Sequence, residues 1–377
     1  VAGRPAIWGL VGLSLLSPQV ASTADGGKGL NATVAIRGLT QHGKYNNALE
    51  DDGRHVDDTT QGATIADLAV TFSPTARDRF YTQVRWASAN SLNNRGDFFY
   101  TAYGGDLEDQ VENVAGRDRD YLREAWYRRD TAIGAQGSLA ITAGLIDATN
   151  YLALNAYFGD EDRQFMNQLL SNNQSVQLPS YDVGGVAEYS TGQWTATAVY
   201  MRPKTPFGKD YKYYAAQIGF RHESDLGTGN IRVLSTLTND RFRNADNTDD
   251  DARVQAIGCS IDQEIGPSLG LFLELGIQDD EAAVTFDTTF MTGLNLDGDL
   301  WSRQDDEIGV AYAYASGADN SRWDDVNMLE SYYRLQLTDA TDIGMTLQYQ
   351  RESIPTVGDD QERFIIALRF NSVFSIF

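Results

Sequence analysis

Arginine, glutamine and carboxylate side chains recur opposite apolar residues along this 377-residue chain. A guanidinium group offers several fixed hydrogen-bond donors, while glutamine, aspartate and glutamate offer acceptors. Placed around a water-filled passage, such groups would replace the hydrogen bonds that a polyhydroxylated solute makes with water. Strand phase predicts these inward-facing positions: Arg37, Gln83, Arg85, Gln217, Arg221, Glu274, Arg334, Gln336, Gln348 and Arg369.

A second set of polar side chains lies in and just before segment 148–180, the longest break between expected strands. Its Asp160–Gln164 stretch, followed by Phe165, Met166 and Leu169, predicts a short helix whose apolar face lies against a wall. We expect the segment to fold inward and narrow the passage, and the wall facing it to be polar. Its candidate residues are Asp147, Asn150, Asn155, Asp160, Glu161, Asp162, Arg163, Gln164 and Asn167.

The elements that position these side chains are expected to be β-strands. From residue 29 onward, stretches of about ten residues with alternating polarity are separated by breaks, which is typical of hairpins. In the clearest stretch, Leu269, Leu271, Leu273, Leu275 and Ile277 form one aliphatic face. Sixteen strands are expected, at approximately 29–40, 60–73, 78–90, 119–130, 135–147, 181–191, 193–203, 211–222, 229–239, 252–263, 268–279, 284–294, 304–316, 326–338, 341–351 and 361–371.

The connections between these strands alternate in length. Short turns, such as 73–76 and 191–192, follow the even-numbered strands, and longer polar segments, such as 41–59 and 91–118, follow most odd-numbered ones. Outer-membrane barrels have short periplasmic turns and long outer loops, whereas a soluble β-sandwich has no reason to sort its connections by length. We therefore expect an all-β, transmembrane antiparallel β-barrel with an inward-folded constriction loop. About 16 strands enclose an aqueous lumen.

Composition excludes several other classes of protein. The chain has 30 Lys+Arg against 53 Asp+Glu, and a net charge of -23 repels the phosphate backbone of nucleic acids. A mean hydropathy of -0.38, without an apolar run of about 18 residues, excludes a bundle of transmembrane helices. One cysteine and three histidines, none in a motif around a nucleophile, leave little material for a disulfide or for catalysis. No enzyme is expected.

The two ends of the chain carry export-like features. Arg4, the apolar stretch 7–16 and the small residues 22–24 follow the order of a secretory leader. Residues 1–24 are expected to be either a leader or a retained N-terminal segment, and residues 25–377 a single barrel domain. The terminal Phe377, after an amphipathic last strand, is similar to the C-terminal signature of outer-membrane barrels.

Acidic clusters at 249–251, 279–281 and 297–307 suggest a hard cation, because calcium takes several carboxylate oxygens. Their spacing is not that of an EF-hand loop, so we expect solvated loops and no cofactor. Two alternatives stay open: calcium binding in these loops, and carboxylates that bridge lipopolysaccharide through divalent ions.

Three stretches of the chain form a recognisable set, in which the order and spacing of the motifs carry more weight than any one motif. They are Ala143–Asp147 with Asn150-Tyr151, Asn155–Phe158, Gln164–Asn167 and Leu178-Pro179; Gly293-Leu294 with Trp301, Arg303 and Asp305–Tyr312; and Glu330–Leu337 with Leu347–Gln350 and Leu368–Phe370. Together they resemble the carbohydrate-selective porin family of the OprB type, and the resemblance covers residues from about 135 to the end. The Trp-Gly-Gly motif usual near the family's mature start is not visible.

This resemblance and the barrel pattern imply a porin in the outer membrane of a Gram-negative bacterium, for passive diffusion of carbohydrates and other small hydrophilic solutes through an arginine-lined lumen. Replacing Arg85 or Arg334 by alanine is then expected to change sugar flux or ion selectivity. The alternatives are a non-specific general porin and a structural or adhesion barrel that binds a surface layer. The expected partners are solutes in transit, outer-membrane lipid and lipopolysaccharide, with a homotrimer and a monomer both allowed.

Overall fold

The computed structural model describes residues 28–50, 53–205, 208–246, 249, 251–319, 321–355 and 360–376. The leader-like segment 1–24, Asp250 of the first acidic cluster and the terminal Phe377 lie outside the described residues. No helix in these ranges is long and apolar enough to cross a membrane.

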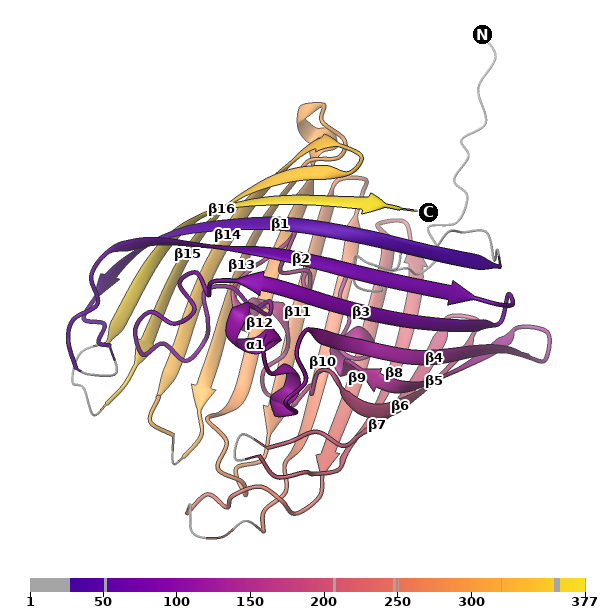
Figure 1. The fold of residues 1–377 in the computed structure, drawn as a ribbon, viewed down its shortest axis with the longest axis horizontal. Helices are drawn as coiled ribbons and strands as arrows, with labels where there is room; N and C mark the ends of the chain where they lie inside the picture. The colour runs from indigo at the N-terminus through magenta and orange to yellow at the C-terminus, as the bar shows by residue number, and fades with distance from the viewer. Residues whose placement is uncertain are drawn as a thin grey trace.

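The expected sixteen-strand antiparallel barrel is confirmed. Each strand pairs with its neighbours in the sequence, and β1 pairs with β16 to close the barrel (Figure 1). The strands are β1 (Gly29–Asn46), β2 (Thr59–Ser73), β3 (Asp78–Ser88), β4 (Leu122–Ile133), β5 (Gly137–Ile146), β6 (Asp182–Thr191), β7 (Trp194–Met201), β8 (Tyr213–Ser224), β9 (Gly227–Thr238), β10 (Gln255–Ile265), β11 (Leu269–Gln278), β12 (Phe286–Asp297), β13 (Glu307–Gly317), β14 (Asp325–Thr338), β15 (Thr341–Ser353) and β16 (Gln361–Ser375).

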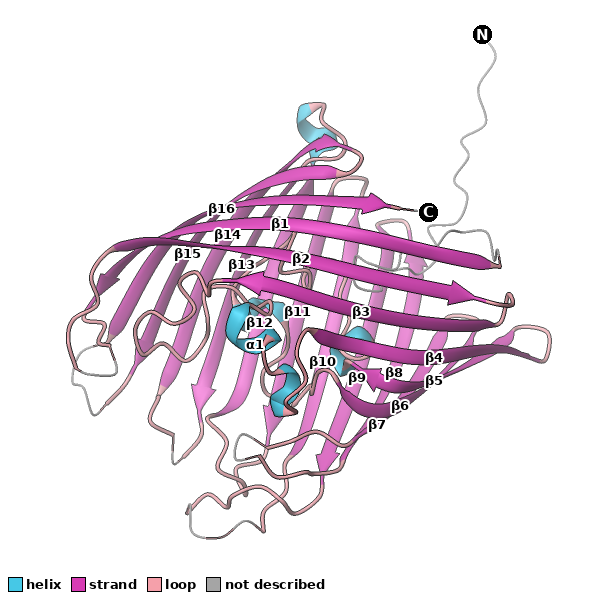
Figure 2. Cartoon of the chain, in the orientation of Figure 1, coloured by secondary structure: helices cyan, strands magenta, loops and turns pink. Residues whose placement is uncertain are grey.

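Helical turns are confined to the connections between strands (Figure 2). Short connections join β2 to β3, β4 to β5 and the later even-numbered strands to their successors, and most connections at the opposite rim are longer. Two connections break this alternation, because 279–285 is short and 298–306 is longer and carries a helical turn. The helical segments are α1 (Glu108–Val111), η1 (Val114–Gly116), η2 (Ala148–Asn150), α2 (Gln168–Ser171) and η3 (Gly298–Trp301).

The outer face of the barrel is apolar because successive strand residues point to opposite faces. On β11, Leu271, Leu275 and Ile277 are exposed, while the intervening Phe272 and Glu274 are buried inside. The aromatic side chain of Trp86 on β3 is exposed as well. Such a surface requires lipid around it, as in transmembrane barrels.

The connection that follows β5, residues 147–181, is called the constriction loop from here on, and it lies against the inner wall. Its Phe158, Phe165 and Leu169 are buried with apolar residues of β11 to β14, among them Phe272. The rings of Phe158 and Phe272 lie 5.1 Å apart between centroids. Burial of such side chains contributes roughly 1.5–3 kcal/mol each, so the loop is held firmly.

Of two expectations about this loop, one holds in part and the other is wrong. The wall facing the loop is apolar where Phe165 packs, because the loop buries its own apolar side chains there, but it is polar where Gln217, Glu274 and Arg369 bind the loop. The stretch Asp160–Gln164 forms a turn, and the helix α2 begins only at Gln168. The turn forms because the Asp160 side chain accepts hydrogen bonds from the backbone N–H groups of Asp162 and Arg163, both at 3.1 Å.

Small inward residues make room for the loop. A Cβ atom on Gly276 would lie 2.1 Å from the side-chain oxygen of Asn173, and one on Gly270 would lie 2.1 Å from the ring of Tyr157. Glycine at these strand positions therefore permits a close approach that a larger residue would block.

Candidate pore constriction

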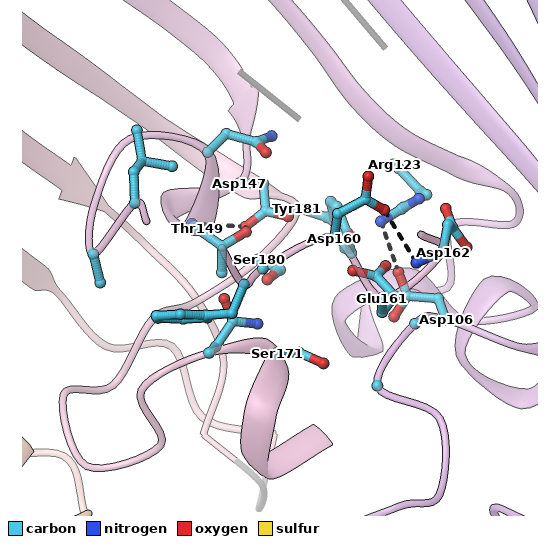
Figure 3. Close-up of a pocket in the computed structure, with 18 of the residues that line it drawn as sticks. Asp106, Arg123, Asp147, Thr149, Asp160, Glu161, Asp162, Ser171, Ser180 and Tyr181 are labelled. Atoms are coloured by element: carbon cyan, nitrogen blue, oxygen red, sulfur yellow. Dashed lines mark hydrogen bonds and ion pairs between the residues drawn. The ribbon is translucent and has the colours of Figure 1, made fainter. Parts of the chain in front are cut away.

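A polar cavity of about 330 Å³ lies inside the barrel (Figure 3). It is bounded by the inner wall at β3 and β4, by the connection 89–121 and by the constriction loop. In the close-up, Asp147 and Thr149 lie on one side, and Asp106, Arg123 and Asp160–Asp162 lie on the other (Figure 3). The lining residues are Gln83, Arg85, Gly104, Gly105, Asp106, Arg123, Glu124, Asp147, Thr149, Asn150, Ala153, Leu154, Asn155, Phe158, Gly159, Asp160, Glu161, Asp162, Gln164, Ser171, Asn172, Ser180 and Tyr181.

A buried network of charges fixes the constriction loop to the first three strands. Asp67 on β2 stands directly opposite Arg85 on β3 and accepts hydrogen bonds from its Nε at 2.7 Å and its Nη2 at 2.9 Å. Arg37 on β1 also pairs with Asp67, and its Nε lies 2.7 Å from Asp162 of the loop. The Tyr103 hydroxyl donates to the same Asp162 carboxylate. Two guanidinium groups and two carboxylates thus compensate one another out of contact with bulk water.

Arg123 reaches the cavity because of a β-bulge. Gln83 pairs with Glu124, but the next residue, Val84, pairs with Leu122, so Arg123 is an extra residue on β4. Bulges of this kind re-aim a side chain. The Arg123 guanidinium lies over the ring of Tyr181, 4.4 Å from its centroid, and its Nη2 lies 3.1 Å from Asp106.

The turn at Asp160 presents two carboxyl groups without a cationic partner. Within the described part of the chain, no basic side chain forms an ion pair with Asp160 or Glu161. Burial and the neighbouring Asp162 carboxylate raise the pKa of Asp160 to about 6 and that of Glu161 to about 7. Both groups belong to the loop, where they would be ionised above about pH 7.

The cation selectivity of the channel should therefore fall as the pH is lowered from about 8 to about 5. A raised carboxyl pKa means that the negative charge is present above it and is lost as the pH falls through it. Reversal potentials in a potassium chloride gradient measure this change. Asp160→Asn with Glu161→Gln should remove most of the pH dependence, and an undiminished dependence would assign it to other groups. The other charged groups around this turn are Arg37, Arg85, Asp162, Arg163 and Arg369.

Nine of the residues expected at the pore line this cavity. Two come from the strands and seven from the constriction loop or its start. Their part in permeation stays a prediction. They are Gln83, Arg85, Asp147, Asn150, Asn155, Asp160, Glu161, Asp162 and Gln164.

Several other inward residues do not line the cavity. They bind the constriction loop, or the connection 89–121, to the inner wall. Arg369 donates to the carbonyl of Glu161 at 2.9 Å, and Gln348 donates to the carbonyl of Ala102 at 2.9 Å. Gln217 accepts from the N–H of Ala153 at 2.8 Å. Glu274 accepts from Asn173 at 3.0 Å, and the expected loop residue Asn167 donates to Gln350 at 3.0 Å.

The remaining candidates are engaged elsewhere on the inner wall. Arg221 pairs with Glu223 and Arg334 pairs with Glu307, both near strand ends at the short-turn rim. Gln336 lies beside Arg334, whose Nη1 donates to it at 2.7 Å. In the loop, the Nε of Arg163 lies 3.3 Å from Asp342.

A second inserted segment, residues 89–121, was not expected from the sequence. The N–H of Phe99 donates to Glu352 of the wall at 3.0 Å, and the N–H of Gly104 donates to the carbonyl of Met166 in the constriction loop at 2.7 Å. Gln168 and Thr101 are hydrogen-bonded to each other as well. The two segments therefore form one joined insert. Only the unusual length of 91–118 could have signalled it.

No three His, Cys, Asp or Glu side chains in the described residues are placed to hold a metal ion. The carboxylates of the cavity are thus dispersed around its wall.

A closed sixteen-strand barrel with an apolar outer surface and inserted segments in its lumen defines a porin, a diffusion channel of the outer membrane. A family model described as carbohydrate-selective porin, OprB family, matches residues 35–374. The chain belongs to this family, whose members are channels and not enzymes. The match extends the resemblance, expected from residue 135 onward, across the N-terminal strands as well.

Solved structures share the fold. The high-pH structure of Pseudomonas putida OprB is similar with a TM-score of 0.73 at 14% identity, over 92% of this chain and 94% of that one. The outer-membrane channel DcaP of Acinetobacter baumannii is similar with a TM-score of 0.57 at 11% identity, over 93% and 98% of the two chains. An uncharacterized protein of Aquifex aeolicus is 27% identical over 267 residues, 71% of this chain and 73% of its own length.

Proposed function

We propose that this protein lets small carbohydrates diffuse passively across the outer membrane of a Gram-negative bacterium, through the cavity beside the constriction loop. The observation that carries the proposal is the composition of the cavity wall. Guanidinium donors of Arg85 and Arg123 are combined there with carboxylate and amide groups of the loop.

Each hydroxyl group of a sugar both donates and accepts hydrogen bonds, so a wall that supplies both kinds of partner can replace the water around it. Arg85 Nη1 and Arg123 Nε are buried, and within the described residues neither has a hydrogen-bond partner. The amides of Asn150 and Gln164 line the same space. For permeation this replacement must be nearly neutral in free energy, since a tight site would retain the solute.

The size of the cavity favours small solutes. Its volume of about 330 Å³ lies at the lower end of the range of about 300–1,000 Å³ common for small-molecule sites. We therefore expect monosaccharides to pass more readily than longer oligosaccharides.

Single-channel current in a planar bilayer, recorded while mono- and oligosaccharides are added, tests the proposal. A saturating, concentration-dependent reduction of the current by sugars is expected, because a sugar in the cavity obstructs ions. An open channel whose current ignores sugars would instead indicate a general porin. A folded protein without any conductance would favour a structural or adhesion barrel.

Arg123→Gln should weaken the block by sugar by about tenfold or more. A hydrogen bond to a charged group contributes about 1.5–3 kcal/mol, and each 1.4 kcal/mol is about a tenfold change in affinity. The measurement is the sugar concentration that halves the current. Arg334→Gln is the matched control. The strand pattern alone predicts that Arg334 affects sugar flux, but this inward arginine lies outside the cavity and pairs with Glu307, so we now expect no effect. Equal effects of both substitutions would refute a site at this cavity.

A further inference from the structure

The cavity wall carries more acidic than basic side chains. Six carboxyl groups and two guanidinium groups line it. The basic residues are Arg85 and Arg123, and Arg85 already forms an ion pair with Asp67 on the neighbouring strand β2. The wall that a solute meets is therefore acidic.

Two of the six carboxylates are compensated by neighbouring arginines. Asp162 pairs with Arg37, and Asp106 pairs with Arg123. The others accept hydrogen bonds only from neutral groups or have no cationic partner within the described residues. Glu124 accepts from Trp126 at 3.0 Å and from the amide of Asn150 at 3.2 Å.

Asp147 and the loop carboxylates complete the uncompensated set. Asp147 accepts from the N–H of Thr149 at 3.0 Å and from its hydroxyl at 2.7 Å. Among the residues that the structure describes, the Asp160 side chain accepts hydrogen bonds from backbone N–H groups of its own turn and forms no ion pair, and Glu161 lies beside it in the lining. A buried carboxylate gains stability when a positive charge approaches, so these groups favour a cationic visitor.

A second observation points to a hydroxylated ligand and not to a bare cation. Two buried donors at the cavity, Arg85 Nη1 and Arg123 Nε, have no partner in the described part of the chain. A metal ion could not satisfy them, and the carboxylates do not converge as metal ligands would. A solute with both a positive charge and hydroxyl oxygens would match the carboxylates and the two donors together.

We propose that this cavity sorts carbohydrates by charge: sugars that carry a protonated amine pass at least as readily as neutral sugars, and sugars that carry a carboxylate or phosphate are excluded. The inference rests on the proposed function, which it deepens by naming the preferred substrate class. The field inside the lumen acts at short range and low effective dielectric, where a repelled anion is disfavoured more than in water. Outside the lumen, the net charge of -23 on the whole chain likewise disfavours the approach of anionic sugars.

Transport into proteoliposomes of the full chain tests the proposal, with the membrane potential held at zero by potassium and valinomycin. The three probes are glucosamine, glucose and glucuronate at equal concentration and near neutral pH. We expect glucosamine to enter at least as fast as glucose, and glucuronate at least about fivefold more slowly. Entry of glucuronate as fast as glucose would overturn the charge inference. Exclusion of all three sugars by a conducting channel would instead overturn the proposed function.

A charge-neutralised variant places the effect at the cavity. Asp160→Asn with Glu161→Gln should raise the ratio of glucuronate to glucose entry several-fold, with glucose entry little changed. The matched control is Asp225→Asn, which removes an exposed carboxylate in the turn between β8 and β9 and should leave the ratio unchanged. An unchanged ratio in the double variant would overturn the assignment to this cavity.

Salt separates discrimination in the lumen from attraction by the outer loops. Interactions between exposed charges are largely screened beyond about 8–10 Å at physiological ionic strength and beyond about 3 Å at 1 M salt. Interactions between buried charges are screened much less. The preference for glucosamine over glucuronate should therefore persist at high salt. Its disappearance there would overturn the proposal in favour of steering by the loops.

Discussion

Replacing residues 157–171 by a glycine-serine linker of the same length should raise the single-channel conductance several-fold. The linker keeps the strands connected at their native spacing but removes the apolar side chains that hold the constriction loop to the wall. It also removes the carboxylates that narrow the cavity, so cation selectivity should fall in the same recordings. A lumen of about 16 strands is wide enough to conduct well once the insert is released.

The anchoring of the loop makes this prediction strong. Glu330 on β14 accepts two backbone hydrogen bonds from the loop, from the N–H of Met166 and, at 3.0 Å, from that of Asn167. Phe165 packs edge-on against Tyr332, with ring centroids 5.0 Å apart. A loop that had lost these contacts would not stay in the lumen, because the ordering of each residue costs about 1–2 kcal/mol of backbone entropy.

A milder variant gives a graded control. Phe165→Ala should increase current noise and raise the conductance less than the linker does. Heat-modifiable migration in gels verifies that each variant forms a barrel before it is recorded. Wild-type conductance in a folded linker variant would show that the constriction lies elsewhere, for example in the segment 89–121.

The strands could be predicted because successive side chains of a barrel strand point to opposite faces, and one of these faces lies in lipid. A slip of one residue on β11 would move Leu271, Leu275 and Ile277 into the lumen and Glu274 into lipid, so the alternation determines the orientation as well as the position. The insertion of the constriction loop was likewise predictable from its length and apolar residues. These are local signals, which a single sequence carries.

The roles of inward polar side chains could not be predicted in the same way. Alternation shows that Arg369 and Gln348 point inward, but both bind backbone carbonyls of inserted segments, and that depends on where those segments lie. The inward direction of Arg123 depends on a bulge between β3 and β4, and the alternation of polar and apolar residues does not reveal this bulge. The insertion of 89–121 depends equally on distant partners, such as Glu352.

The buried charge network gives the second large prediction, because its positive and negative charges balance. Asp67→Asn leaves two buried guanidinium groups, Arg37 and Arg85, with Asp162 as their remaining carboxylate. Removing one member of a buried ionic set costs about 3–5 kcal/mol, since the uncompensated charge stays out of water. We expect a loss of that order in the free energy of unfolding, measured by urea titration of the reconstituted barrel.

The size of that loss should depend on charge balance and not on the number of hydrogen bonds. Asp67→Leu with Arg85→Met removes more polar contacts than Asp67→Asn, yet it leaves one guanidinium, Arg37, against one carboxylate, Asp162. The double variant should therefore be more stable than the single one, as apolar replacements of buried ion pairs often are. Asp130→Asn is the control, since its 42% exposed carboxylate pairs with Arg128 near the rim and should cost no more than about 1 kcal/mol. If the double variant were the least stable of the three, hydrogen bonding and not charge balance would hold the first three strands to the constriction loop.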